Sequence, residues 1–369
     1  MSFDADNRLT AFNGWGVFFD PDGNMTTGPA VPTQQGLTIR RRLAQQDPFN
    51  SEWQRVLAAS YDTVGDVLIA QGKLPEALEA HQQSLAIIKR LAEQDRSNSG
   101  WQRDLSVSYQ KVGSILAAQG KLPEALEAHQ QSLTIIKRLA EQAHSNSGWQ
   151  CDLAVSYERV GSILAAQGKL PEALEAYQQD LMIAKRLAKQ DRSNAEWQRD
   201  LSISYEKVGD VLAAQGKLSE ALEAYQQALP IAKRLADQDK SNTGLQRDLA
   251  WVYGKVGNVL LVQGQSTPTE GTKAMELLDQ AMTAYRSALE FYTREKEPQD
   301  WALTQNNLGI ALEELGTRSG AEEGPKLLQD AVAAFRSALE VYTCDKEPQD
   351  WGQTQDCHRR SENPVKSPV

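Results

Sequence analysis

The sequence has few of the residues that build metal or redox sites. Three cysteines and four histidines occur among 369 residues, and no two histidines have the spacing of a metal-ligand pair. An odd and sparse set of cysteines does not suit a disulfide framework and favours a reducing compartment. We therefore expect a cytoplasmic protein with no metal and no cofactor.

Long apolar runs and excess positive charge are missing as well. No stretch approaches the roughly 20 apolar residues of a membrane span, and the first residues lack the charged-then-apolar pattern of a signal peptide. The formal net charge of −10 argues against a nucleic-acid backbone as the main partner. No nucleophile–base set stands out. The sequence thus predicts neither a membrane protein, nor a nucleic-acid binder, nor an enzyme, and it offers no catalytic residue.

What the sequence has instead is a repeat of 48 residues. The stretch Trp101–Gly148 returns with few changes from Trp53, Trp149 and Trp197, and again from Leu245, where the tryptophan is lost. Self-similarity at a fixed period of this size is typical of a solenoid, in which each unit packs on its neighbours.

Each repeat has the pattern of two helices. Apolar residues three and four apart mark one face of the first helix: Trp101, Leu105, Tyr109, Val112 and Leu116. Gly120 is placed to end that helix in a left-handed conformation, and Pro123 suits the first turn of the second. The cluster 145–148, of sequence SNSG, offers capping residues for the next helix.

The pattern resembles the tetratricopeptide repeat (TPR), a helical-hairpin repeat. The residues that carry the resemblance are Tyr109, Val112, Gly113, Leu116, Ala125 and His129. The family's closing proline is absent, and the period exceeds the usual 34 residues. Such long helices are similar to those of kinesin light chains and of arrays in bacterial signalling proteins. The resemblance implies an all-α superhelical solenoid of antiparallel helix pairs.

Small and aromatic residues recur at fixed places in the repeat. Gly113, Gly161 and Gly209 lie beside the apolar face, so we predict that two helices touch there. His81 and His129 fill a slot that is tyrosine in the next two repeats, and we interpret them as packing residues.

The chain divides into four segments: residues 1–32 outside the repeat, residues 33–264 with 48-residue repeats, residues 265–354 with 50-residue repeats, and residues 355–369 without a pattern. The first segment is expected either to cap the array or to be partly disordered, and the last to be a disordered tail. Pro230 is predicted to kink a helix. The insert after Gly264 is predicted to supply a loop and an earlier helix start.

The resemblance also implies a groove lined by the first helices. Placed by the Tyr109 and Gly113 register, a basic column follows this face: Lys111, Arg159, Lys207 and Lys255. Polar and acidic residues share the face: Gln110, Glu158, Glu206, Asn306 and Asn307. Acidic and basic columns could pair between adjacent repeats, each exposed pair giving about 0–1 kcal/mol. Alternatively, the columns form a ladder that binds a ligand.

The resemblance implies a protein–protein interaction scaffold that binds a partner protein or peptide in this groove, with mixed-charge peptides favoured over polyanions. The alternative is a sensor or regulatory array, split from or acting with a bacterial signalling effector of the NTPase or protease type. The sequence leaves open the partner's identity and the oligomeric state.

Overall fold

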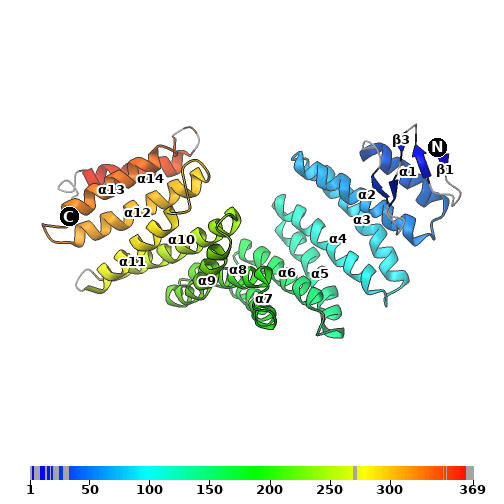
Figure 1. Cartoon of the computed structure of the whole chain (residues 1–369), viewed down its shortest axis with the longest axis horizontal. Coiled ribbons are helices and arrows are strands. Elements are labelled where there is room, and N and C mark those ends of the chain that lie inside the picture. Colours follow the sequence, from blue (N-terminus) through cyan, green and yellow to red (C-terminus); the bar gives the residue numbers. More distant parts are fainter. Residues whose placement is uncertain are drawn as a thin grey trace. The chain divides into compact units, whose positions relative to one another are not determined.

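The computed structural model describes residues 33–268, 272–343, 345 and 347–362, together with five short strands near the N-terminus. The chain forms two compact units, residues 1–167 and residues 168–369. Each unit is built from helices that pack on their neighbours in the chain (Figure 1).

The first unit contains six helices among its described residues. They are α1 (Thr33–Gln46), α2 (Ser51–Ala70), α3 (Leu74–Gln94), α4 (Ser99–Ala118), α5 (Leu122–Gln142) and α6 (Ser147–Ala166). Helices α2 and α3 form one antiparallel hairpin, and α4 and α5 form the next (Figure 1). Buried aliphatic residues such as Ala58, Leu91 and Leu105 join the two hairpins in one core cluster.

The second unit contains eight described helices. They are α7 (Leu170–Gln190), α8 (Ala195–Ala214), α9 (Leu218–Gln238), α10 (Thr243–Ser266), α11 (Thr272–Leu289), α12 (Pro298–Arg318), α13 (Gly324–Leu339) and α14 (Pro348–Glu362). Its core includes Ala232, Leu249 and Val252, from helices α9 and α10. Both units are all-α solenoids of antiparallel helix pairs from residue 33 onward, as the sequence predicts.

The helix ends follow the local sequence signals. The Asn98 side chain accepts a hydrogen bond from the Trp101 backbone N–H at 3.0 Å, and Asn146 does the same for Trp149 at 3.1 Å. These bonds satisfy donors that a helix start leaves unpaired. Four hairpin turns carry a glycine with φ between +74° and +76°: Gly72, Gly120, Gly168 and Gly216. The predicted caps and glycine stops are confirmed.

In each 48-residue repeat a glutamine of the first helix binds the preceding helix, and we call this contact the glutamine bridge. Gln102 Nε2 donates to the carbonyl oxygen of Ala92 at 2.8 Å, and its Oε1 accepts from Arg138 at 2.6 Å. The carbonyls in the last turn of a helix lack intrahelical donors, so the bridge satisfies one of them. The glutamines that make this bond are Gln54, Gln102, Gln150, Gln198 and Gln246.

The recurring glycines lie at close helix contacts. A Cβ atom on Gly113 would lie 2.8 Å from His129 Nε2, and one on Gly209 would lie 2.6 Å from Tyr225 Cε1. The prediction is confirmed for these two, and Gly161 is buried. Burial of His129, and next the positive charge of Arg159, lower its pKa to about 4, which fits a neutral packing residue.

Short strands occur in the N-terminal segment. Five strands lie within it: β1 (Ser2–Phe3), β2 (Leu9–Phe12), β3 (Trp15–Gly16), β4 (Phe18–Phe19) and β5 (Met25–Thr27). The first three form one antiparallel sheet, and β4 pairs with β5. A capping role for residues 1–32 stays a prediction.

The last described helix, α14 (Pro348–Glu362), extends past residue 355, where the sequence predicts a tail. Helix α14 includes residues 355–362, which were expected to be disordered. These residues make contacts that hold the helix, because Arg336 binds Glu362 at 2.6 Å and Arg360 lies 3.5 Å from Glu313. Residues 363–369 lie outside the described residues.

The insert after Gly264 lengthens a hairpin. Helix α10 runs through Gly264 to Ser266, about one turn past the position where α8 ends in its repeat. Helix α11 also starts earlier in register than α9, as predicted. Pro230 lies inside α9, which is a single continuous helix. A kink at Pro230 stays a prediction.

Candidate functional site

Two bases of the predicted column are paired with acids of the preceding repeat. Lys111 Nζ lies 3.1 Å from Asp66 Oδ2, and Lys255 Nζ lies 2.9 Å from Asp210 Oδ1. A second carboxylate, Asp62, lies 3.8 Å from Lys111. Pairs of this kind neutralise the column at these positions, in the first and second unit respectively.

The other column residues have varied surroundings. Arg159 is half-exposed and its nearest carboxylate is Glu158 on the same helix, at 3.5 Å, while Lys207 is partly buried. Gln110 donates to Ser156 Oγ at 3.0 Å. The column is therefore not a uniform row of free cations.

A second pair of columns links adjacent repeats. Arg103 Nε lies 2.6 Å from Asp152, and Arg199 Nε lies 2.5 Å from Asp248. Each arginine makes two hydrogen bonds to its carboxylate. The side chains are partly exposed, so each pair contributes about 0–1 kcal/mol. Here the pairing between repeats is what the structure shows.

Glu206 is buried rather than displayed. Burial, and next the negative charges of Asp248 and Asp210, raise its pKa to about 8, while the hydrogen bond from Ser202 and the positive charge of Lys255 oppose the rise. Ser202 Oγ donates to its carboxyl at 3.4 Å. At neutral pH this side chain is mostly protonated, so it is no anionic ligand group.

The two predicted asparagines belong to a hydrogen-bond chain in the second unit. Thr354 donates to Asn306 Oδ1 at 2.9 Å, and Asn306 donates to Asn307 Oδ1 at 3.4 Å. Asn307 in turn donates to Asn258 Oδ1 at 3.1 Å, which also accepts from Tyr285 at 2.8 Å. The chain fixes the surface of helices α10, α12 and α14.

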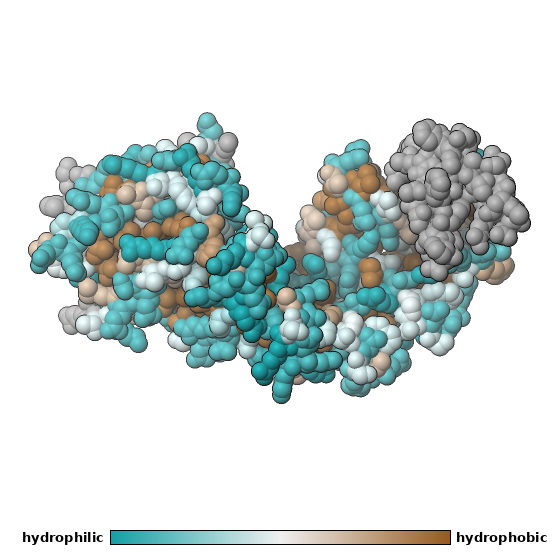
Figure 2. Space-filling view, in the orientation of Figure 1, coloured by the Kyte–Doolittle hydropathy of each residue, from teal (hydrophilic) through white to brown (hydrophobic). Residues whose placement is uncertain are grey.

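Exposed apolar residues recur on the first helices, and we call them the apolar stripe. In the first unit they are Val107 and Val155, 40% and 45% exposed, and in the second unit Trp251 and Leu303, 43% and 46% exposed. Figure 2 shows hydrophobic residues exposed among hydrophilic ones in both units. The signal in the sequence is a bulky apolar residue six positions before the recurring glycine of a first helix, and the groove register had picked out Val107 among them.

Each unit has a hollow on its stripe. In the first unit a groove of about 320 Å³ crosses helices α2, α4 and α6, with Val107 and Val155 on its walls and Lys111 and Arg159 at its edges. We call it the first-unit groove. It brings together three of the predicted site residues, since Gln110 also lines it.

In the second unit the corresponding hollow has about 170 Å³, and we call it the Tyr292 pocket. Helix α10 contributes Trp251 and Lys255, and α12 contributes Leu303 and Asn307. The Lys255 ammonium lies 4.7 Å from the centroid of the Trp251 ring, which steadies that exposed side chain.

Comparison with protein families gives the same repeat. Family models described as tetratricopeptide repeat match residues 57–96, 106–146 and 152–234. These segments of the chain are similar to the tetratricopeptide repeat. A comparison with curated protein sequences gives no match.

Solved structures with the TPR architecture are similar over most of the chain. BtubC (BKLC) from P. vanneervenii is 18% identical with a TM-score of 0.50, over 71% of this chain and 91% of that one. The apo form of RapI is 11% identical with a TM-score of 0.56, over 90% of this chain and 81% of that one. At these identities the likeness supports the fold alone.

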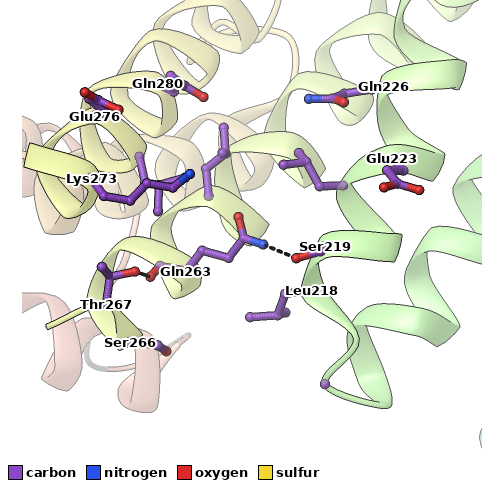
Figure 3. A pocket seen from close by; sticks show the side chains of 14 residues that line it. Leu218, Ser219, Glu223, Gln226, Gln263, Ser266, Thr267, Lys273, Glu276 and Gln280 are labelled. Carbon is purple, nitrogen blue, oxygen red and sulfur yellow. Dashed lines mark hydrogen bonds between the residues drawn. The ribbon is translucent and has the colours of Figure 1, made fainter.

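A hollow of about 670 Å³ lies where the helical hairpins change length. Helix α9 forms one wall, and the extended ends of α10 and α11 form the other (Figure 3). Gln263 donates to Ser219 at 3.3 Å across its floor, and the Lys273 side chain reaches toward it. Among the described residues that line it, no buried polar side-chain atom lacks a partner. The first-unit groove and the Tyr292 pocket have stronger marks of a site.

Metal and membrane sites find no support in the described part of the TPR array. No cluster of three metal-ligating side chains occurs among residues 33–268, 272–343 and 347–362. No described helix is both long and apolar enough to cross a membrane. Cys151 and Cys357 form no disulfide among the described residues, and Cys344 lies outside them.

Proposed function

We propose that the protein is an interaction scaffold whose apolar stripe binds a segment of a partner protein. The observation that carries this proposal is the recurrence of exposed Val107, Val155, Trp251 and Leu303 at the same register position of four first helices, two in each unit. Apolar surface rimmed by polar residues marks interaction sites in soluble proteins. Repeat proteins use such aligned positions as extended binding surfaces.

The neighbouring charges set the kind of segment that fits. Lys111 and Lys255 are neutralised by Asp66 and Asp210, so neither groove presents strong positive charge. A polyanion would gain little there, whereas apolar side chains would bury the stripe and gain roughly 25 cal/mol per Å² of apolar area. Trp251 is the expected hot spot, because tryptophan dominates binding energy at many interfaces.

Affinity capture from native lysate, followed by mass spectrometry, supplies the partner for the test. Val107→Glu with Val155→Glu alters the stripe in the first unit, and Trp251→Glu with Leu303→Glu alters it in the second. Each double variant should weaken the complex at least about tenfold, since a buried unpaired charge is costly. Unchanged circular dichroism must accompany the loss.

Met182→Glu is the matched control. Met182 is 58% exposed and lies on α7, which is the second helix of its repeat, whereas the stripe residues lie on first helices. It should leave the partner's affinity unchanged. Equal loss from Met182→Glu, or full binding by both stripe variants, would show that the stripe is not the binding surface.

A charge-reversal variant tests the basic column separately. Changing Lys111, Arg159, Lys207 and Lys255 to glutamate should weaken the complex if the partner contacts the column. Binding that survives this change but not the stripe changes would assign the column to pairing between repeats. An NTPase- or protease-type protein among the captured partners would point to a regulatory array acting with an effector.

A further inference from the structure

The Tyr292 pocket contains a buried hydroxyl without a partner. Tyr292 lies just after α11 and is 3% exposed, and its hydroxyl has no hydrogen-bond partner in the described part of the chain. Most buried polar groups are hydrogen-bonded, because desolvation without a bond costs free energy. An unpaired phenol in the lining of a pocket is therefore an argument for a missing ligand group.

The surroundings of this hydroxyl are mainly acidic. Burial, and next the negative charge of Asp300, raise the pKa of Tyr292 far above its usual value, so the phenol stays neutral. Glu297 and Asp248 act in the same direction, and Arg247 opposes them. Asp300 lines the pocket itself, in the first turn of α12.

The cation already in the pocket is engaged elsewhere. Lys255 Nζ lies 2.9 Å from Asp210 and over the Trp251 ring. No ion pair joins Lys255 to Asp300 among the described residues. The carboxylate of Asp300 and the Tyr292 hydroxyl thus remain to be matched by a group from outside the chain.

We propose that the Tyr292 pocket receives a lysine or arginine side chain of the partner segment. This inference rests on the proposed function and names the chemistry of one partner residue. The cationic head donates hydrogen bonds to the Asp300 carboxylate and to the Tyr292 oxygen, and charge-assisted bonds of this kind are the strong ones. Its aliphatic stem packs beside Leu303 and Trp251, as the stems of long basic side chains do on apolar surface.

Other ligand side chains fit less well. A carboxylate would face Asp300, and like charges in a partly desolvated site repel. A neutral side chain such as glutamine would leave the Asp300 charge without a counter-ion. A pocket of about 170 Å³ holds one side chain and not a whole cofactor.

Three tripeptide probes on the full chain test the assignment. They are acetyl-Leu-Arg-Leu-amide and the same peptide with Gln or Glu in the middle, with binding followed by calorimetry and by the NMR signal of the Trp251 indole. The arginine peptide should bind at least about tenfold more tightly than the glutamine peptide, and the glutamate peptide most weakly. Equal binding of the three, or no binding at millimolar concentration, overturns the inference.

Two isosteric variants locate the effect. Asp300→Asn should weaken the arginine peptide by about tenfold and leave the glutamine peptide unchanged. Tyr292→Phe should weaken the arginine peptide by about threefold, while the melting temperature stays the same or rises because an unpaired buried hydroxyl is removed. A melting temperature that falls with Tyr292→Phe would show that the hydroxyl has a structural partner, and would overturn the inference.

The chain supplies a matched control one repeat later. Tyr342 is buried, and burial and next the negative charge of Asp350 raise its pKa, as burial and Asp300 do for Tyr292. Asp350→Asn and Tyr342→Phe should not change peptide affinity, and an equal loss would contradict the assignment. The peptide experiment does not need the captured partner. If the pocket does not prefer the arginine peptide, the inference about the pocket fails, whereas unchanged partner binding by the stripe variants contradicts the proposed function.

Discussion

Glu206 shows how one residue can make stability depend on pH. Its carboxyl is buried among Ser202, Asp210, Asp248 and Lys255, and its pKa of about 8 exceeds the ordinary value for glutamate of 4.5. Between these two values the folded protein holds a proton that the unfolded chain releases. The contribution of this group to stability is therefore complete below pH 4.5 and is lost as pH rises through 8.

We expect the free energy of unfolding to fall as pH rises from about 5 to about 8 through this residue. Glu206→Gln keeps the shape and removes the titration, so its stability should decline less over that range. Urea unfolding at several pH values measures both proteins. Identical pH dependence of the two would mean that the carboxyl is ionised in the folded protein at neutral pH.

Single residues also show where sequence reasoning about the site reaches its limit. The basic column could be read from spacing, but its partners could not. Asp66 and Asp210 occupy a slot that holds Ser114 in another repeat, and each lies 45 residues before the lysine it binds. These ion pairs depend on how far one first helix is shifted along its neighbour. The packing of the helices sets that shift, and the residue spacing in the sequence does not show it.

Pairs of helices meet at a glycine, and α10 offers a test with an internal control. A Cβ on Gly257 would lie 2.7 Å from Tyr285 Cε1 of α11, whereas a Cβ on Gly254 would meet nothing within 4 Å. Gly257→Ala should destabilise by about 1–3 kcal/mol, because the ring must move. Gly254→Ala should stabilise by about 0.5–1 kcal/mol, because alanine is the better helix former.

Thermal and urea unfolding of the two variants measure the difference. Opposite signs at positions three residues apart cannot come from helix propensity, which is the same change at both. If both variants gained stability, the close contact between α10 and α11 would be absent in solution.

The elements themselves were largely predictable. Asn98 caps α4 and Gly120 follows its end with φ of +75°, because both signals act within a few residues. Gly264 has the same slot as Gly216 but lies inside a helix. There Leu278 packs at the glycine and Arg318 donates to its carbonyl oxygen at 3.0 Å. Contacts from α11 and α12 therefore determine where α10 ends, and the local sequence around Gly264 does not reveal them.

At the scale of the whole molecule, each of the repeats that begin at Trp53, Trp101, Trp149 and Trp197 has its own cap, glycine stop and junction contact. Deleting residues 101–148 joins Gly100 to Trp149, so Asn98 would cap the helix that contains Trp149. Gln150 would then take the place of Gln102 opposite Ala92. We expect a folded protein with proportionally less helix signal in circular dichroism and a cooperative melt.

A deletion out of register is the control. Removing residues 101–138 discards fewer residues but joins Gly100 to Leu139, so the last turn of α5 stands where α4 should begin. Ala140 then takes the place of Gln102 opposite Ala92, and the new join has no glutamine bridge. This variant should aggregate or melt without cooperativity. Equal behaviour of the two deletions would mean that junction contacts do not determine folding.

The glutamine bridge has a consequence for the evolution of the gene. Because the same bond closes every junction within the 48-residue array, any repeat can follow any other without new chemistry at the join. Gene segments that encode nearly identical repeats recombine out of phase, and each such event adds or removes a whole number of them. The length of this protein can therefore change in steps of one repeat during evolution, and the product of each step can still fold.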